Sequence, residues 1–380
     1  MTTHEMFRLM KEHLLTTFAI LLQLGTVSAQ TTVIDKPGVY IGSWQGDNAT
    51  PAITVNCTGV YIYKSTISGS GILIQVNPGA GVTVQDSYLD GLNPNVYGYR
   101  ASVGVSATQA SKLYVLNCAF RNLGSAIIED SAFCGWPDIL IQQCSFEHQN
   151  ARLSNGGGGW LWSQGWNPNI TFMRTKSYNN EQHRFSIHWC DIINTAGVDW
   201  TEDQINLYQS AGCDISYNYI QDSIGPTWNG IVTDDPWADG IPRTPEYNWT
   251  AYDNTIHDNI LVTASIGIWA GHDNRVYNNF VVNSGKLANG QWNTAHPQFG
   301  LGRFNPEGDA WAQTNSVTGN VSGVIYPTGG RQDYIDEVHG SGWMGNTLLK
   351  KNVINTTEAQ VYSTKRQPEL SQRGLTIGPS

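Results

Sequence analysis

The chain has 380 residues, and its 31 Asp and Glu against 21 Lys and Arg give a formal net charge of -10. A chain this acidic is not suited to following a phosphate backbone, which argues against nucleic acid as a partner. The 40 Gly and 14 Trp argue against a disordered chain and indicate one rich in turns, strands and aromatic surface.

The first thirty residues have the pattern of a secretory signal peptide. Arg8 and Lys11 precede an apolar run at 14–25, and small residues just before Gln30 offer a cleavage point. The run is too short to span a bilayer, and no later segment of the sequence could do so. We therefore expect residues 1–29 to be removed, a secreted mature protein, and no membrane partner.

An eight-residue pattern then recurs, with apolar residues in the first, third and eighth places and a small polar residue or Cys in the sixth. Copies lie at 60–67, 82–89, 113–120, 139–146, 185–192, 213–220, 249–256 and 347–354, with weak copies at 273–280 and 315–322 and a poor one at 170–177. The period of two predicts short strands on both sides of a one-residue break. Because the spacing between copies is irregular, the pattern predicts a solenoid that carries loops of variable length.

The sixth-place residues are expected to form a ladder at one corner of the coils. An Asn at a tight corner can adopt left-handed backbone angles, and its amide can bond to the same residue in the neighbouring coils. We expect Asn218, Asn254 and Asn278 to stack in this way. Three cysteines in the sixth place are expected to be buried stacking residues before bridge formers: Cys118, Cys144 and Cys190.

The remaining sequence signals concern metals and modification. The six cysteines show no spacing typical of a structural zinc site. Asn-x-Ser/Thr sequons are compatible with a glycoprotein, and they lie at Asn48, Asn56, Asn169, Asn248, Asn320 and Asn355.

With this repeat, the chain resembles the right-handed parallel β-helix proteins of the pectin-lyase-like superfamily over residues 53–357. The resemblance implies three strands per coil, three parallel sheets and an Asn ladder at one turn. We therefore predict an all-β fold, a right-handed parallel β-helix of about ten coils in a single domain, residues 30–380, and a monomer. The catalytic motifs of polygalacturonases and mannuronan epimerases are incomplete or absent, so the resemblance concerns the fold more than the chemistry.

A second short apolar strand precedes most copies of the repeat and ends in polar or aromatic residues. The strands lie at 125–130, 159–164, 205–210, 230–235, 267–272 and 299–304. In the resembling superfamily, the strand at this place floors the substrate groove. The resemblance brings one set of residues to that face, as an upper bound because alternation turns some inward: Glu129, Asp130, Trp162, Gln164, Tyr208, Asp234, Asp235, Trp269, His272 and Arg303.

Five of these residues have chemistry suited to catalysis. Asp234 and Asp235 can act as acid and base or bind Ca²⁺, although Asp-Pro also starts solvated turns. His272 can move a proton or simply bond to a corner backbone group. Tyr208 and Arg303 suit removal of the proton α to a uronate carboxylate, or ordinary packing.

The other five candidates are expected to bind substrate: Glu129, Asp130, Trp162, Gln164 and Trp269. Tryptophan is frequent between residues 159 and 312, and its flat apolar face suits stacking on pyranose rings.

Two classes of function follow from the sequence. The first is a secreted enzyme that cleaves a polysaccharide in the groove. It would be a uronate lyase that works by β-elimination, which the resemblance favours, or a glycoside hydrolase with a carboxylate pair. The second is a non-catalytic carbohydrate-binding or adhesive β-helix.

Overall fold

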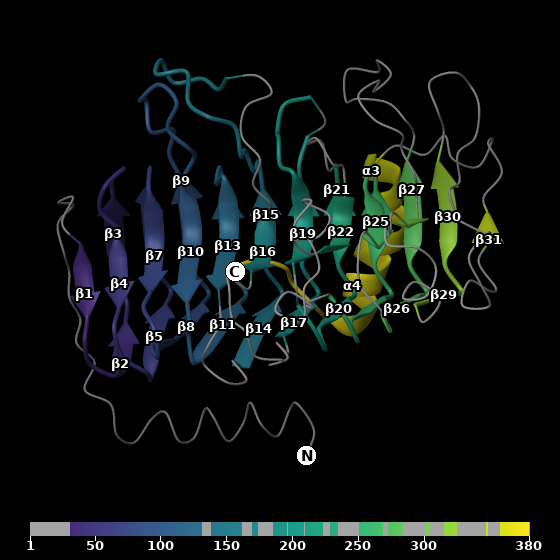
Figure 1. The fold of residues 1–380 in the computed structure, drawn as a ribbon, viewed down its shortest axis with the longest axis horizontal. Coiled ribbons are helices and arrows are strands. Elements are labelled where there is room, and N and C mark those ends of the chain that lie inside the picture. Colours follow the sequence, from purple (N-terminus) through teal and green to yellow (C-terminus); the bar gives the residue numbers. More distant parts are fainter. Residues whose placement is uncertain are drawn as a thin grey trace, which may run out of the picture.

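The computed structural model describes residues 31–130, 138–161, 169–173, 185–195, 197–208, 210–222, 229–234, 251–268, 273–283, 301–303, 315–324, 347–348 and 358–379. Up to β30 the chain visits three sheets in turn, so that each sheet takes every third strand, and β31 then pairs with β30. Neighbouring strands within each sheet are parallel, and the sheets run along the long axis of the molecule (Figure 1). The prediction of an all-β parallel β-helix is therefore confirmed.

The three sheets are named A, B and C here. Sheet A contains β1 (Thr32–Ile34), β4 (Ile53–Val55), β7 (Ile72–Val76), β10 (Val103–Thr108), β13 (Ser125–Asp130), β16 (Ile170–Met173), β19 (Asp203–Tyr208), β22 (Asn229–Asp234), β25 (Ser265–Ile268) and β28 (Leu301–Arg303). Sheet B contains β2 (Gly38–Tyr40), β5 (Val60–Tyr63), β8 (Gly81–Gln85), β11 (Lys112–Leu116), β14 (Asp138–Gln142), β17 (Phe185–His188), β20 (Asp214–Ser216), β23 (Thr255–His257), β26 (Arg275–Tyr277) and β29 (Ser316–Thr318). Sheet C contains β3 (Ser43–Gly46), β6 (Thr66–Gly69), β9 (Tyr88–Gly91), β12 (Ala119–Arg121), β15 (Ser145–Glu147), β18 (Asp191–Ile193), β21 (Tyr219–Gln221), β24 (Ile260–Val262), β27 (Phe280–Asn283), β30 (Val321–Val324) and β31 (Thr347–Leu348).

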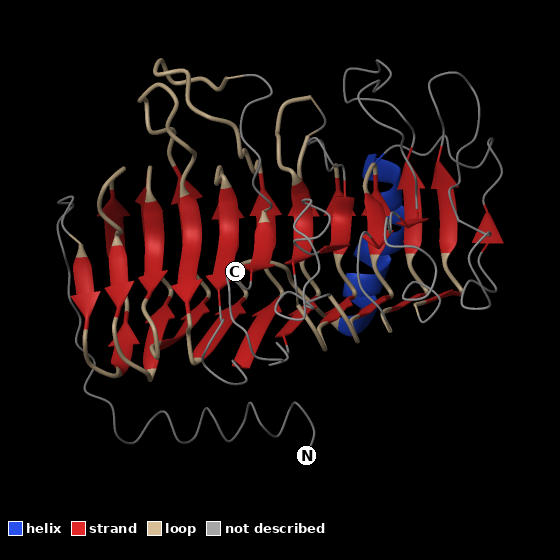
Figure 2. Cartoon of the chain, in the orientation of Figure 1, coloured by secondary structure: helices blue, strands red, loops and turns tan. Residues whose placement is uncertain are grey.

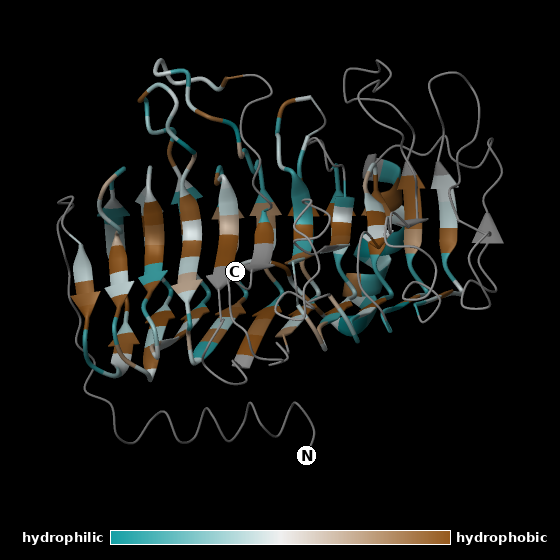
Figure 3. Cartoon of the chain, viewed as in Figure 1, coloured by the Kyte–Doolittle hydropathy of each residue, from teal (hydrophilic) through white to brown (hydrophobic). Residues whose placement is uncertain are grey.

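Alternating side chains build the core. In β11, Leu113 and Val115 are fully buried, while Lys112, Tyr114 and Leu116, which alternate with them, are partly exposed. Leu113 is in register with Val82 of β8 and Ile139 of β14, so apolar side chains meet the same kind of side chain in the next coil. One apolar cluster extends in this way from the first coil to β29, and apolar bands recur along the strands (Figure 3). The first coil, β1 to β3, precedes the segment over which the resemblance was seen.

The expected corner ladder lies between sheets B and C. Its rungs are Ser65, Ser87, Cys118, Cys144, Cys190, Asn218, Asn259, Asn279 and Asn320, each directly before a strand of sheet C. The backbone N–H of Asn218 donates to Asn259 Oδ1 at 3.0 Å, and the Asn218 side-chain amide donates to the same oxygen at 3.0 Å. The same pair of bonds links Asn259 to Asn279 and Asn279 to Asn320. The side chains thus supply partners that the turning backbone lacks.

Two of the three predicted Asn rungs were assigned to the wrong place. Asn254 belongs to a second ladder, between sheets A and B, in which its backbone N–H and side-chain amide donate to Asn274 Oδ1. Asn274 donates in the same way to Asn315 Oδ1. Asn278 is not a rung; it precedes Asn279 and has a left-handed φ of 56°. Left-handed conformation and side-chain bonding therefore fall on adjacent residues rather than on one Asn.

The cysteine rungs behave as small buried residues. Cys118, Cys144 and Cys190 are fully buried free thiols. The Cys144 sulfur accepts a bond from the Cys118 backbone N–H at 3.4 Å. Burial raises the pKa of Cys144 and of Cys190 well above that of a free thiol, so these thiols are packing groups and not reactive ones.

The glycosylation sequons differ in whether their Asn is buried or exposed. Asn169 and Asn320 are 0% exposed, and Asn320 is a rung of the ladder. Asn56 is exposed, and its amide nitrogen bonds to Asp35 at 2.8 Å. Asn248 and Asn355 lie outside the described residues. A glycan on Asn169 or Asn320 is incompatible with the folded coil, whereas Asn56 has room for one.

A C-terminal helix not predicted from the sequence covers part of sheet C (Figure 2). It consists of α3 (Glu358–Val361), the π-helical turn η2 (Tyr362–Arg366) and α4 (Gln367–Arg373). Val361 and Tyr362 pack on a second apolar cluster that includes Tyr219, Ile260 and Val282 of sheet C. The helix is therefore held by apolar side chains that sheet C turns away from the main core. No helix in the described part of the chain is long and apolar enough to cross a membrane.

One buried ion pair fixes this helix to the B–C corner. Arg366 is 0% exposed, and its guanidinium contacts Asp191 Oδ1 at 2.7 Å. Tyr362 donates to the other Asp191 oxygen at 2.7 Å, and Arg366 also donates to the backbone oxygens of Tyr217 and Cys190. Beyond the helix, the chain runs back along the corner, where Gly378 N–H donates to the Gln143 oxygen at 2.8 Å.

We expect two adjacent substitutions to have opposite outcomes. Asn279→Leu should lower the free energy of unfolding by about 1 to 3 kcal/mol, because it leaves buried backbone groups of two coils without partners. Asn278→Gly should be neutral or slightly stabilising, since Gly adopts a left-handed φ without steric cost. Urea denaturation of both variants measures the difference. An equal loss of stability in the two would contradict the rung assignment.

Removal of the buried arginine should loosen the helix. Arg366→Met leaves the Asp191 carboxylate buried without its cation, and we expect a loss of about 3 to 5 kcal/mol. The double variant Arg366→Met with Asp191→Leu should recover most of this loss, because no buried charge then remains. Denaturation of wild type, both single variants and the double variant gives the coupling energy. A double variant no more stable than Arg366→Met would refute this account of the contact.

Candidate functional site

Sheet A brings two of the predicted catalytic residues together. Tyr208 of β19 and Asp234 of β22 occupy facing register positions on neighbouring strands. Ile205 and Leu207 of β19 belong to the core, so alternation places Tyr208 on the outer face, where it is half-buried. Adjacent strands of a sheet lie about 4.8 Å apart, which is within the span of one sugar residue.

The other candidates on sheet A are more widely spread. Asp130 of β13 is in register with Thr108 and Met173, and β16 separates β13 from β19. Glu129 is in register with Ala107, which is buried. Arg303 of β28 is in register with Ile268, which is also buried. Glu129 and Arg303 thus lie in rows that contain core residues.

Half of the predicted site falls outside the described residues. These residues are Asp235, His272, Trp162, Gln164 and Trp269. The groove strand predicted at 159–164 is not the sheet A strand of its coil, which is β16, Ile170–Met173. Leu153 instead forms an isolated bridge with Arg100, and Ser154 forms one with Trp160.

A buried polar network that sequence reasoning missed supports the start of the sheet A strands. Asp203 is 2% exposed, and its two carboxylate oxygens accept from Asn229 at 3.0 Å and Asn206 at 3.1 Å. Ser265 then donates to Asn229 Oδ1 at 3.3 Å. Because a carboxylate only accepts, it fixes which way both amides point. Within the described residues, Asn206 Oδ1 is buried without a hydrogen-bond partner.

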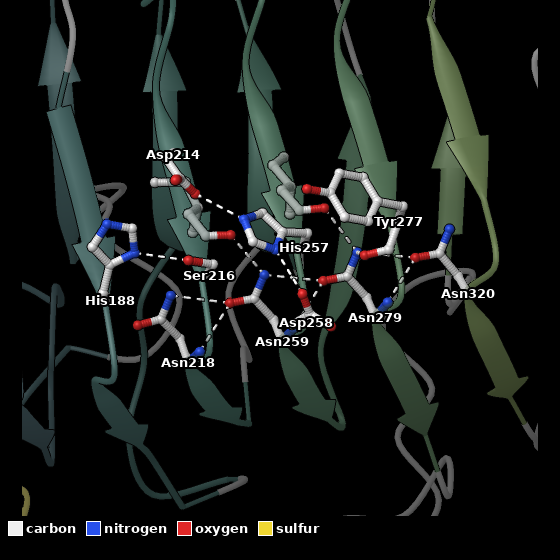
Figure 4. Close-up of polar contacts among 12 residues, drawn as sticks. His188, Asp214, Ser216, Asn218, His257, Asp258, Asn259, Tyr277, Asn279 and Asn320 are labelled. Atoms are coloured by element: carbon white, nitrogen blue, oxygen red, sulfur yellow. Dashed lines mark hydrogen bonds and ion pairs between the residues drawn. The ribbon is translucent and has the colours of Figure 1, made fainter. Parts of the chain in front are cut away.

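The outer face of sheet B carries a second polar cluster, drawn in Figure 4. His188, Ser216, His257 and Tyr277 form one row across neighbouring strands. His257 contacts Asp214 Oδ1 through Nε2 at 3.1 Å and Asp258 Oδ2 through Nδ1 at 2.7 Å. His188 Nδ1 bonds to Ser216 Oγ at 2.7 Å.

Stacked aromatic rings lie against this cluster. The His257 ring stacks on Tyr277 with centroids 4.8 Å apart, and Trp189 stacks on Tyr217 with centroids 4.5 Å apart. Arg373 of α4 lies 4.7 Å from the Trp189 ring centre. Each stacked pair covers one face of each ring, and the four rings stay partly exposed. The arrangement is a stack that joins coils.

The geometry of the sheet B cluster does not favour catalysis. Ser216 is only 2% exposed, so a substrate carbonyl cannot reach its hydroxyl. Both nitrogens of His257 face carboxylates, and the ring donates to both only when it carries two protons. Neither nitrogen is then free to take a proton from a substrate. These residues hold β17, β20, β23 and β26 together.

The metal prediction rested on Asp234 and Asp235, the second of which lies outside the described residues. In the part of the chain that the structure describes, no group of three or more His, Cys, Asp or Glu side chains is arranged to hold a metal ion. Ca²⁺ therefore stays a prediction.

Comparison with known proteins adds no assignment to this geometry. No protein-family model matches the sequence, and a search of curated proteins finds no significant match.

His188→Gln should make the protein less sensitive to acid. Burial lowers the pKa of His188 below the 6.5 of a free imidazole. As the pH falls through that value, the unfolded chain takes up a proton that the folded chain does not, so the contribution of His188 to stability is lost. Gln cannot titrate and can still donate to Ser216. The free energy of unfolding, measured at about pH 7.5 and about pH 5, should fall less in the variant. An equal fall in both proteins would contradict the prediction.

Proposed function

We propose that the protein is a secreted carbohydrate-active enzyme of the pectin-lyase-like superfamily that cleaves a uronate polysaccharide by β-elimination on the outer face of sheet A. The register pairing of Tyr208 with Asp234 carries the proposal, because it supplies a phenol and a carboxylate on neighbouring strands of a parallel β-helix. The superfamily and the secretion rest on the repeat and the N-terminal sequence pattern.

The proposed reaction divides its roles between these two residues. The Tyr208 phenol, as phenolate, takes the proton α to the uronate carboxylate. The electron pair of the broken C–H bond forms a double bond to the β-carbon, the bond from that carbon to the glycosidic oxygen breaks, and the leaving oxygen takes a proton from water. Asp234 holds the sugar in place beside Tyr208. Ca²⁺, when bound, would supply positive charge to the uronate carboxylate, and Asp234 is the described residue suited to holding it.

Strand spacing argues against one carboxylate pair for a hydrolase, whereas the pair predicted from the sequence, Asp234 and Asp235, includes a residue outside the described ones. A glycoside hydrolase needs two carboxyl groups about 5 to 9.5 Å apart. Asp130 and Asp234 stand on β13 and β22, which are separated by β16 and β19. Three strand spacings amount to about 14 Å, which is too far for that pair.

The experiment is incubation with polygalacturonate, alginate and other uronate polymers, with and without a chelator, while the ultraviolet absorbance of the unsaturated product is followed. Tyr208→Phe and Asp234→Asn should each lower the rate by about 100-fold or more, with unchanged circular dichroism. Asp214→Asn is the matched control, because it removes a carboxylate from sheet B and should leave the rate unchanged.

Three results would count against the proposal. New reducing ends without the absorbance would indicate a hydrolase, and neither signal on the whole panel would indicate a binding protein. Full activity in both sheet A variants would move the site to another face of the helix.

A further inference from the structure

Two loops at the corner between sheets C and A pack into one ordered projection. The first spans residues 92–100, between β9 and β10, and the second spans residues 152–161, between β15 and β16. The strand-like bridge between Arg100 and Leu153 joins them. They rise together from one edge of the stacked sheets (Figures 1 and 2).

Hydrogen bonds fix the backbone of both loops. Ser154 N–H donates to the Tyr99 oxygen at 2.8 Å, and Gly98 N–H donates to the Ser154 oxygen at 2.9 Å. Asn93 links the loops through its side chain, which donates to the Gly159 oxygen at 2.9 Å and accepts from Ser154 Oγ at 2.8 Å. The projection is therefore preorganised, and a ligand would not have to order it.

This rigid projection presents large apolar side chains to solvent. Tyr97 is 71% exposed and Tyr99 is 51% exposed, and Leu92 and Val96 of the same loop are 42% and 41% exposed. Gly156, with φ of 79°, lets the second loop approach Tyr97, because a Cβ there would stand 3.2 Å from the Tyr97 nitrogen. A concentrated apolar patch on an ordered loop is typical of a binding surface.

We propose that Tyr97 and Tyr99 form a second carbohydrate-binding surface, which holds pyranose rings of the polymer by their C–H faces. The ligand class rests on the proposed function. The first loop ends just before β10 of sheet A, so the patch lies at the edge of that sheet. An exposed tyrosine offers a flat apolar ring and a hydroxyl that can bond to sugar hydroxyls.

Charge and size argue against other occupants of this patch. The two loops contain two charged side chains, Arg100 and the buried Arg152, whereas binding to an anionic membrane surface uses clusters of Lys or Arg. A stable protein interface has about 20 to 30 residues on each side, many more than this patch exposes.

The test uses the full-length protein carrying Tyr208→Phe, so that a polymer is not consumed while Asp234 stays in place to hold the sugar. Affinity gel electrophoresis measures its dissociation constants for polygalacturonate and xylan. Tyr97→Ala with Tyr99→Ala should weaken binding to at least one polymer by about tenfold. Tyr88→Ala is the matched control, because Tyr88 is 42% exposed on sheet C, and it should bind as before.

Each outcome decides the proposal. Undiminished binding in the double tyrosine variant, or no binding by the parent protein to either polymer, would overturn it. So would a dimer in size-exclusion chromatography that the double variant abolishes without any change in sugar binding. Weakened binding by the double tyrosine variant, together with a wild-type protein that cleaves no polymer, would support the tyrosine surface while rejecting the lyase, so the two proposals fail separately.

Discussion

At every corner between sheets B and C the backbone must leave one sheet and enter the next, and an amide N–H there has no partner within a strand. A side-chain oxygen or sulfur of the following coil accepts from it, as Asn259 Oδ1 does for Asn218. Because each rung depends on the next coil, the ladder fixes the register of all three sheets at once. The rows of outer residues on sheets A and B, and therefore any site built on them, inherit their alignment from these corner bonds.

The fold could be predicted because its period is short and repeats many times. The register could be predicted only in coils where the residues at and beside the B–C corner are of different types. From Ser65 to Asn218 each rung residue differs in type from the residue before it, and these rungs were assigned correctly. At Asn254 both corners of the coil carry Asn, and at Asn278 two Asn stand side by side, so the pattern fits in two ways. The left-handed φ of Asn278 decides between them, and backbone angles are not visible in sequence letters.

The candidate site also contains residues that the repeat predicts and residues that it does not. Tyr208 and Asp234 end similar strands one coil apart, so their pairing follows from the repeat. The row of His188, Ser216 and His257 follows from the repeat too, two residues before each rung, and correct alignment of the later copies would have found it. The sequence could not predict the polar network of Asp203 and Asn206, since its importance comes from burial by neighbouring coils. The C-terminal helix was missed because it does not take part in the repeat.

The path of residues 358–379 changes how the coils are expected to unfold. In a simple solenoid each coil touches only its neighbours, and the array can fray from either end. Here the chain returns over its own coils, from the sheet C cluster around Val282, past Asp191, to Gln143 and Tyr88. Coils distant in sequence are thereby fastened by one continuous segment, so they should melt as a unit. The fastening segment follows in sequence all the coils that it fastens, so each of those coils is synthesised before it gains this contact.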